Sequence, residues 1–230
     1  MGIKCPRDLE VDLALRNYAT YFPNTKFIIG IRNPLSWFVS FYNFRITNEF
    51  PMPPSTSHIL IGKCKRANQG VCTSRANFTH HLSKLEKNSG GSRNVFLYHV
   101  DQLNDKDPIR SKQFLVDLSN FLQLSVPMND PMIWIKPGQN ITNTYNGNTT
   151  KMKEIQSLQI SNICDPKYNT IRNVLNQLAI ESSNYIQSKL LQPQRRSDGD
   201  NNDHHPNVVV SSRDYFIELL NQLKVDPCSI

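Results

Sequence analysis

Arg32 and Ser40 are the residues of this sequence whose types and spacing best suit a chemical task. Both lie in the segment KFIIGIRNPLSWFVSFYNFR at residues 26–45, with Ser40 eight positions after Arg32. An arginine guanidinium is a planar fork of N–H donors that matches two phosphate oxygens, and a serine hydroxyl donates one more hydrogen bond. The pair therefore predicts binding of a phosphate or a similar anion.

A strand followed at once by a helix would bring these two side chains to one end of a sheet. Residues 26–31 are apolar on both faces, which is the pattern of a buried parallel strand. Asn33-Pro34 is typical of a helix start, and we expect that helix to run to about Arg45. Ligands of open α/β sheets collect at the carboxyl ends of strands, and a helix start offers unpaired N–H groups. We therefore expect Arg32, the helix start and Ser40 to converge on one phosphate.

Helical spacing divides this expected helix into two faces. The polar face carries three residues at positions i, i+4 and i+7, namely Ser36, Ser40 and Asn43. The other face is aromatic and carries Trp37, Phe41 and Phe44. We expect the aromatic face to anchor the helix in the core and the polar face to meet the ligand.

Three segments together resemble the sulfotransferase family, whose enzymes transfer a sulfuryl group from 3′-phosphoadenosine 5′-phosphosulfate (PAPS) to a hydroxyl or an amine. Arg32-Asn33-Pro34 with Ser40 is similar to the family's 3′-phosphate-binding motif. Residues 94–103, NVFLYHVDQL, are similar to a later strand that ends in an acidic residue and a leucine. Residues 114–124, FLVDLSNFLQL, are similar to the helix that follows that strand. The resemblance implies that Arg32 and Ser40 bind the 3′-phosphate of PAPS, a nucleotide co-substrate.

The resemblance also implies an α/β, P-loop-like sulfotransferase fold in which helices flank a parallel sheet. The family's other signature is a strand, a loop with Lys and Gly, and a helix that together hold the 5′-phosphosulfate. Residues 1–21 contain no such pattern. We therefore expect residues 1–230 to form a single partial domain that begins inside the fold and lacks this N-terminal phosphosulfate-loop unit.

The catalytic base is not identified in the sequence, because the family's His or Glu base usually lies upstream of the Arg-Asn-Pro motif. His58 is a candidate, since some glycan-directed members place a histidine near the sulfuryl group in the loop after the motif. We read the pairs His80-His81 and His204-His205 as surface residues. Asp101 is expected to cap a turn rather than to act as a base.

Two functions from different classes follow from these residues. The first is sulfuryl transfer from PAPS to a carbohydrate or small-molecule acceptor, in the Golgi lumen or secretory pathway if the protein extends beyond this chain. The second is a truncated, non-catalytic protein that binds adenosine 3′,5′-bisphosphate or an acidic glycan.

Charge and hydropathy exclude other classes. The chain has 26 Lys and Arg against 19 Asp and Glu, a net charge of +7, which suits an anionic partner. The basic residues are dispersed, without zinc-ligand spacing or an RNA-binding aromatic signature, so we expect no nucleic-acid partner and no metal. No stretch approaches the roughly 18 apolar residues of a membrane span, so we expect a soluble chain without a membrane segment.

The five cysteines suggest disulfides rather than a metal site, because no Cys-x-x-Cys pair occurs. One hypothesis pairs Cys64 with Cys72 around a short polar loop. Another pairs Cys164 with Cys228 and ties a helix start to the C-terminus. The cysteines and three Asn-x-Thr sequons, at Asn77, Asn140 and Asn148, favour a luminal protein.

The remaining pattern predicts helices and strands in the order of an α/β protein. Expected helices begin at Asp8, near Phe78, at Asp107-Pro108, at Asp165-Pro166 and at Ser212, and a second strand covers residues 95–100. We expect loops at residues 51–70 and 127–162. Residues 192–205 have no apolar anchor, and we expect them to be a disordered loop.

Overall fold

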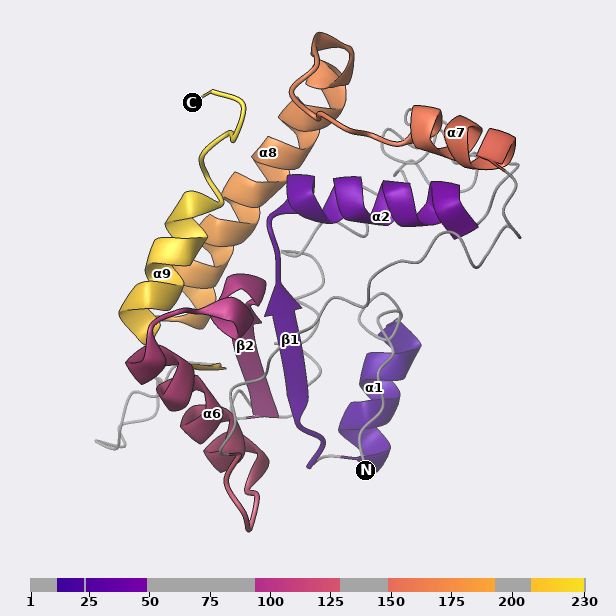
Figure 1. Ribbon diagram of the computed structural model, residues 1–230. Helices are drawn as coiled ribbons and strands as arrows, with labels where there is room; N and C mark the ends of the chain where they lie inside the picture. Colours follow the sequence, from indigo (N-terminus) through magenta and orange to yellow (C-terminus); the bar gives the residue numbers. More distant parts are fainter. Residues whose placement is uncertain (1–11, 23, 49–93, 129–148, 193–207, 230) are drawn as a thin grey trace. The chain divides into compact units, whose positions relative to one another are not determined.

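The computed structural model of the chain describes residues 12–22, 24–48, 94–128, 149–192 and 208–229 (Figure 1). These residues divide into two compact units, each of which is described by itself, and the division at the start of the chain falls between Arg32 and Asn33. Helix α8 (Asn169–Tyr185) contributes to both units, because the second boundary falls between Leu178 and Ala179. Within the described ranges, no helix is both long enough and apolar enough to cross a membrane.

The first unit is a small parallel sheet with helices on both faces. Its strands are β1 (Phe27–Ile31), β2 (Val95–His99) and β3 (Val209–Val210). Its helices are α1 (Asp12–Tyr21), the 3₁₀ turn η3 (Val100–Asn104), α6 (Pro108–Leu122), the end of α8, the π-helical turn η6 (Ile186–Leu190) and α9 (Arg213–Gln222). The strand order is β1-β2-β3 and both pairings are parallel, so the expected α/β class is confirmed.

The register of the sheet fixes which residues lie at its carboxyl edge. Ile31, the last residue of β1, is the partner of His99, the last residue of β2. Arg32 therefore follows β1 at the edge where η3 follows β2. The strand is less covered than its apolar sequence predicts, because Ile28 is 45% exposed. Among the described strands β1 pairs with β2 only, which leaves it at the edge of the sheet.

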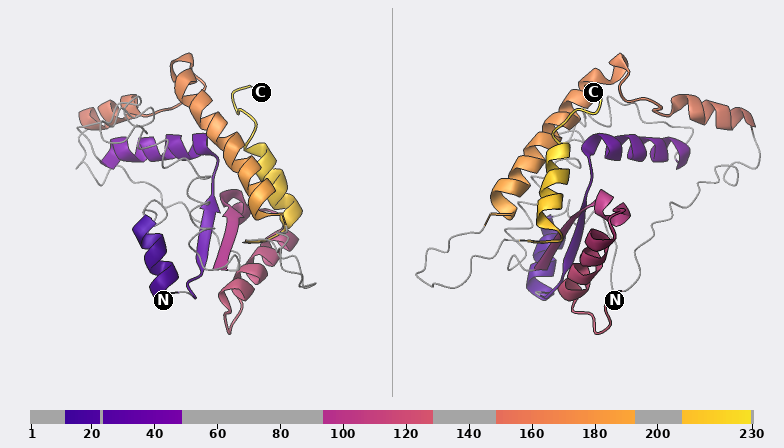
Figure 2. Two further views of the ribbon diagram at one scale, coloured as in Figure 1. Left: turned by 180° about the vertical axis from the view of Figure 1, so that it is seen from behind. Right: turned by 60° about the vertical axis from the view of Figure 1, so that its left-hand side comes forward.

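Alternate side chains of the strands supply two hydrophobic cores. One face of the sheet packs with residues of the end of α8, η6 and α9, through Ile29, Ile31, Val95 and Leu97. The end of α8 and helix α9 lie side by side in both views of Figure 2. On the other face, Phe96 packs against α6 with its ring edge-on to Phe114, at 5.8 Å between ring centroids. The sheet is thus clamped between two helical layers, as the alternation of strand and helix in the sequence predicts.

Gly30 is required by a close approach within this sheet. The Tyr98 side chain lies over Gly30 on the neighbouring strand, where a Cβ atom would stand 2.7 Å from the Tyr98 hydroxyl oxygen. Real Cβ atoms do not approach other atoms so closely, and glycine alone accepts the ring without a shift. Burial under these neighbours raises the pKa of the Tyr98 phenol.

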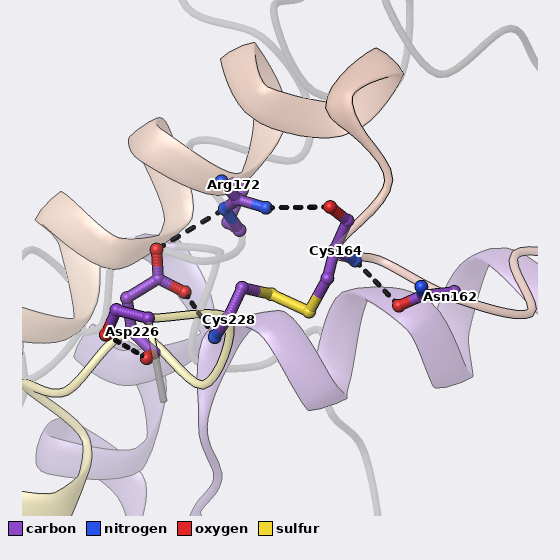
Figure 3. The surroundings of a disulfide bond; sticks show 6 residues. Asn162, Cys164, Arg172, Asp226 and Cys228 are labelled. Atoms are coloured by element: carbon purple, nitrogen blue, oxygen red, sulfur yellow. Dashed lines mark hydrogen bonds and ion pairs between the residues drawn. A yellow bond between two sulfur atoms is a disulfide. The ribbon is translucent and has the colours of Figure 1, made fainter.

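The second unit is helical. It contains α2 (Pro34–Asn48), α7 (Thr149–Leu158), the 3₁₀ turn η5 (Pro166–Tyr168), the first part of α8 and the residues from Asp226. Its core is formed by eight buried apolar side chains: Leu35, Phe38, Tyr42, Ile46, Ile160, Ile171, Leu175 and Leu178. The hypothesis that Cys164 pairs with Cys228 is confirmed, because the two form a disulfide that holds the C-terminal residues on the turn before α8 (Figure 3).

Several expected elements have their predicted starts, and others do not. Asp107 caps α6 by accepting hydrogen bonds from Ile109 N and Arg110 N, with Pro108 at the first helical position, as Asp-Pro predicts. The prediction of a loop over residues 127–162 is wrong at α7, whose first residues, Thr149 and Thr150, are weak helix formers. Strand β3 was not predicted, because two residues carry no alternating pattern.

Helix α1 only partly forms the apolar stripe that its sequence predicts. Tyr18 meets Phe27 of β1 edge-on at 5.5 Å between ring centroids, but Phe22 is 61% exposed. The predicted cap Asp8 and the segments 51–70 and 78–87 lie outside the described residues, as do Cys64, Cys72, the sequons and nearly all of segment 192–205.

Candidate functional site

The turn between β1 and α2 has the helix start that Asn33-Pro34 predicts. Asn33 Oδ1 accepts hydrogen bonds from the N–H groups of Leu35 at 2.9 Å and of Ser36 at 3.3 Å. The Asn33 carbonyl accepts the next one, from Trp37 N at 2.8 Å. Pro34 is buried and has no N–H to satisfy. Asn33 is therefore the N-cap of α2, as predicted.

This cap changes the expected way of binding an anion. The expectation was that unpaired N–H groups at the helix start would hold a phosphate, but the first two available N–H groups are already bonded to Asn33 Oδ1. The Asn33 side-chain oxygen thus accepts the hydrogen bonds that a bound anion would otherwise accept. The expectation of unpaired amides is therefore wrong, and any anion at this turn must be held by side chains and by the dipole of α2.

Arg32 is partly buried, and its guanidinium has no partner among the described residues of its unit. It makes no hydrogen bond or ion pair with another described residue of that unit. Other arginines of the same unit are engaged: Arg110 pairs with Asp105 at 2.7 Å and with Asp107 at 3.1 Å, and Arg213 donates to Leu191 O at 2.6 Å. Arg32 is thus a cation at the carboxyl edge of the sheet whose N–H donors are not used by the described part of its unit.

Ser40 is an exposed residue in the second turn of α2, and its hydroxyl also has no partner among the described residues of its unit. Hydroxyls inside helices commonly donate to the carbonyl four residues earlier, as Thr47 does to Asn43 O and Ser119 to Leu115 O. Ser40 has no such bond among the described residues of its unit. Its O–H and lone pairs therefore remain available to a ligand.

Asn43 does not belong to a ligand-facing surface, contrary to the polar face drawn from the sequence. Its Nδ2 donates to Ile160 O at 3.0 Å and its Oδ1 accepts from Ile160 N at 2.8 Å, so the amide pairs with one backbone unit as a neighbouring strand would. Gln159 adds a bond to Thr47 Oγ1 at 3.0 Å. These contacts fasten the segment after α7 to α2, and Asn43 is a structural residue.

Asn43→Ala is expected to destabilise the protein without changing its ligand binding. The substitution leaves the N–H and C=O of the buried Ile160 without partners, which costs roughly 1–3 kcal/mol. Ser40→Ala, on the exposed face of the same helix, is the matched control and should change the free energy of unfolding by less than about 0.5 kcal/mol. Denaturant unfolding of the two variants measures the difference, and equal losses would contradict this role of Asn43.

The face of α2 that fills the core is not the expected face of Trp37, Phe41 and Phe44. The side chains that fill the core are Leu35, Phe38, Tyr42 and Ile46, all at most 7% exposed. Trp37 and Phe41 stack on each other at 5.1 Å between ring centroids and are only partly buried, and Phe44 is 53% exposed. The core-facing stripe is thus rotated by about one residue, to the positions i, i+3, i+7 and i+11 that begin at Leu35.

The end of β2 carries a buried polar cluster that the sequence analysis missed. His99 Nδ1 accepts from Asp101 N at 3.3 Å, and Gln102 Oε1 accepts from His99 N at 2.8 Å, a capping box around η3. Gln102 Nε2 donates to Ser211 O at 3.0 Å, and Ser211 Oγ donates to Asp117 Oδ2 at 2.6 Å. The cap is therefore His99 and not the predicted Asp101; the spacing His-x-x-Gln was the signal that could have revealed it.

The predicted site residues are not gathered into one described site. Arg32 belongs to the first unit and Ser40 to the second, so their convergence on one anion stays a prediction. His58 and the pairs His80-His81 and His204-His205 lie outside the described residues. Among the described residues, no group of His, Cys, Asp and Glu is arranged to hold a metal ion.

The chain matches no model of a protein family, no curated protein and no solved structure.

Proposed function

We propose that this protein binds PAPS through its 3′-phosphate and belongs to the PAPS-dependent sulfotransferases, with a P-loop-like sulfotransferase fold. One observation carries the proposal: Arg32 directly follows a parallel strand, the capped helix after it carries Ser40, and neither side chain has a partner among the described residues of its own unit. The segments that resemble the family form β1 with α2, then β2, then α6, which are the kinds of element that the resemblance implies.

The chemistry of these two groups suits a phosphate monoester. The Arg32 fork would donate two parallel hydrogen bonds to the dianion, and the Ser40 hydroxyl would donate a third. The Asn33 cap fixes the first turn of α2, so a regular helix connects Asn33 to Ser40 within the second unit. The positive end of the helix dipole adds a favourable field near the anion.

The reaction that this binding would serve is an in-line displacement at sulfur. A base takes the proton of the acceptor hydroxyl, a new oxygen–sulfur bond forms, and the bond from sulfur to the bridging oxygen breaks, which releases adenosine 3′,5′-bisphosphate. Arg32 and Ser40 position the nucleotide and move no proton. The acceptor we propose is a carbohydrate in the Golgi or secretory pathway, and the Cys164–Cys228 disulfide supports such an oxidising compartment.

Titration with adenosine 3′,5′-bisphosphate tests the proposal through Arg32. Removing one charged hydrogen-bond partner costs about 1.5–3 kcal/mol, so Arg32→Ala is expected to weaken binding by about 10- to 150-fold. Arg16→Ala, which removes an exposed cation of α1 in the same unit, is the matched control and should bind like the wild type. Isothermal calorimetry gives the affinities. Equal affinity of wild type and Arg32→Ala, or no binding by the wild type, would overturn the proposal.

Ser40 is tested against its neighbour on the same face of α2. Ser40→Ala is expected to weaken bisphosphate binding by about 10-fold, whereas Ser36→Ala, one turn nearer the helix start, should leave it unchanged. Transfer of labelled sulfate from PAPS to a panel of carbohydrates then separates the two functional classes. Nucleotide binding without any transfer would assign the protein to the non-catalytic binders instead.

A further inference from the structure

His99 occupies a position where a change of protonation would change the structure around it. It ends β2 opposite Ile31 of β1, it begins η3, and its side chain is 4% exposed. Its own N–H is held by Gln102 Oε1, and Gln102 also bridges to Ser211, directly after β3. The residue thus sits where the carboxyl ends of β2 and β3 are joined.

The cap requires the neutral form of the imidazole. Nδ1 can accept the Asp101 N–H only while it carries no proton, so the proton of the neutral ring lies on Nε2. Burial lowers the pKa of His99 below its usual value of 6.5, and the Asp101 carboxylate opposes part of that shift. Nε2 is buried and has no hydrogen-bond partner among the described residues. Protonation of Nδ1 would give the ring a positive charge while its Nε2–H stays buried without an acceptor, which raises the free-energy cost of the charged form.

The Asp101 carboxylate is a second possible partner of His99 Nδ1, for the protonated ring. Asp101 Oδ2 lies 3.4 Å from the same Nδ1 atom, and the Asp101 side chain is 65% exposed. A proton on Nδ1 would end the bond from the Asp101 amide and start a bond to the Asp101 carboxylate. One ring atom therefore has two mutually exclusive partners on one residue, the main-chain N–H in the neutral state and the carboxylate in the charged state.

The elements that contact β2 and η3 carry other ionisable groups. Among these groups are Asp101 on η3, Arg32 after β1, Asp117 on α6, and Arg213 and Tyr215 on α9. Asp117 is occupied by Ser211 and Gln113, and Arg213 by Leu191 O. Asp101 is the one among them that shifts the titration of His99.

We propose that His99 is a pH-sensitive switch at the carboxyl edge of the sheet, in which protonation moves Nδ1 from the Asp101 amide to the Asp101 carboxylate and loosens η3. The bridge from Gln102 to Ser211 starts from the same turn, so the loosening reaches the residues after β3. This inference rests on the His99 cluster alone and holds whatever ligand Arg32 binds.

The sign of the pH effect follows from the direction of the pKa shift. Because the pKa of His99 is lowered in the folded state, the unfolded chain binds the proton more readily. The folded state is therefore most stable above the unfolded pKa of about 6.5, and it loses stability as the pH falls toward the folded pKa. Between about pH 7.5 and about pH 5.5, the folded-to-unfolded ratio should fall by up to about tenfold on account of His99.

Denaturant unfolding of three proteins at these two pH values tests the switch. His99→Asn keeps an oxygen that can accept the Asp101 N–H but does not titrate. The folded-to-unfolded ratio of this variant should therefore fall less between the two pH values than that of the wild type, by a factor of up to about ten. Asp101→Asn removes the carboxylate that favours the charged ring, so its folded-to-unfolded ratio should fall at least as much as that of the wild type. The same loss in wild type and His99→Asn, or a smaller loss in Asp101→Asn than in wild type, would overturn the proposal.

Proton NMR of the wild-type histidines gives a readout that does not depend on a folded His99→Asn variant. The His99 ring should titrate below its usual range in the wild type and lower still in Asp101→Asn. The protection of the Asp101 amide against exchange, relative to an unstructured amide at the same pH, should fall as the ring takes its proton. A His99 ring that titrates at or above about 6.5 would equally overturn the proposal. Bisphosphate affinity enters none of these measurements, so a failure here is distinct from a failure of the proposed function.

Discussion

Replacing both Cys164 and Cys228 with serine is expected to lower the free energy of unfolding by about 4 kcal/mol at 25 °C. The disulfide closes a loop with a sequence separation of 64 residues, and the entropy that such a loop removes from the unfolded chain gives this magnitude. The loss corresponds to roughly a thousandfold change in the folded-to-unfolded ratio. Denaturant unfolding under oxidising conditions measures it.

The folded structure around the disulfide supports a loss of this size. Arg172 on α8 lies 3.3 Å from Asp226 Oδ2 and donates to Cys164 O at 3.3 Å, so the same few residues hold both ends of the bridge (Figure 3). Cys228 N donates to Asp226 Oδ1 at 2.9 Å. Without the covalent bond, these contacts would have to fix the C-terminal residues alone.

Reduction of the wild type is the control for this prediction. Dithiothreitol should lower the free energy of unfolding of the wild type to that of the double serine variant. If dithiothreitol also lowers the free energy of unfolding of the variant, that loss comes from the other three cysteines. Equal stability of the wild type with and without reductant would contradict the prediction. A dependence on the disulfide would also support folding in an oxidising compartment, as the proposed carbohydrate sulfotransferase requires.

Phe38→Ala is expected to cost about 3–5 kcal/mol of stability, the second large effect. Phe38 is fully buried on α2 and packs against Tyr42 at 5.7 Å between ring centroids, within the core of the second unit. Truncation removes the transfer free energy of the ring and leaves a cavity that the surrounding helices fill only in part. Denaturant unfolding gives the change.

Phe22→Ala is the matched control for Phe38→Ala, because Phe22 is also a phenylalanine but is 61% exposed at the end of α1. Its loss should stay within about 1 kcal/mol, since little of that ring is removed from water on folding. Similar losses in the two variants would mean that α2 does not carry the core of its unit. The comparison matters for function, because the packing of Phe38 fixes the rotation of α2 and so exposes Ser40.

Predictions from the sequence succeeded where one local signal decides the structure. The apolar run at residues 27–31 and the Asn33-Pro34 turn gave a strand and a capped helix, because cap and first turn lie within a few residues of each other. The Asp107-Pro108 start of α6 succeeded for the same reason. The proposed anion ligands, Arg32 and Ser40, come from this local reading, and the structure adds that neither is bonded to a described residue of its own unit.

Predictions failed where a distant segment decides what a side chain does. Asn43 was assigned to a polar ligand-facing surface, but its partner, Ile160, is 117 residues away. The amides at the start of α2 were expected to await an anion, but the short Asn33 side chain reaches them first. Asp101 was expected to be a cap, but His99 takes that role because the end of β2 is buried beside β1.

The sequence by itself determined the alternation of strand and helix and the Asn33 and Asp107 caps, which depend on spacing along the chain and on residue types that act within one or two turns. It offered the pairing of Cys164 with Cys228 only as a hypothesis, which the folded structure confirms. The tertiary structure alone decided that Asn43 serves the fold, that burial lowers the pKa of His99 and that Gly30 makes room for Tyr98. Each of these depends on burial and on partners far apart in sequence, which a periodic pattern does not encode.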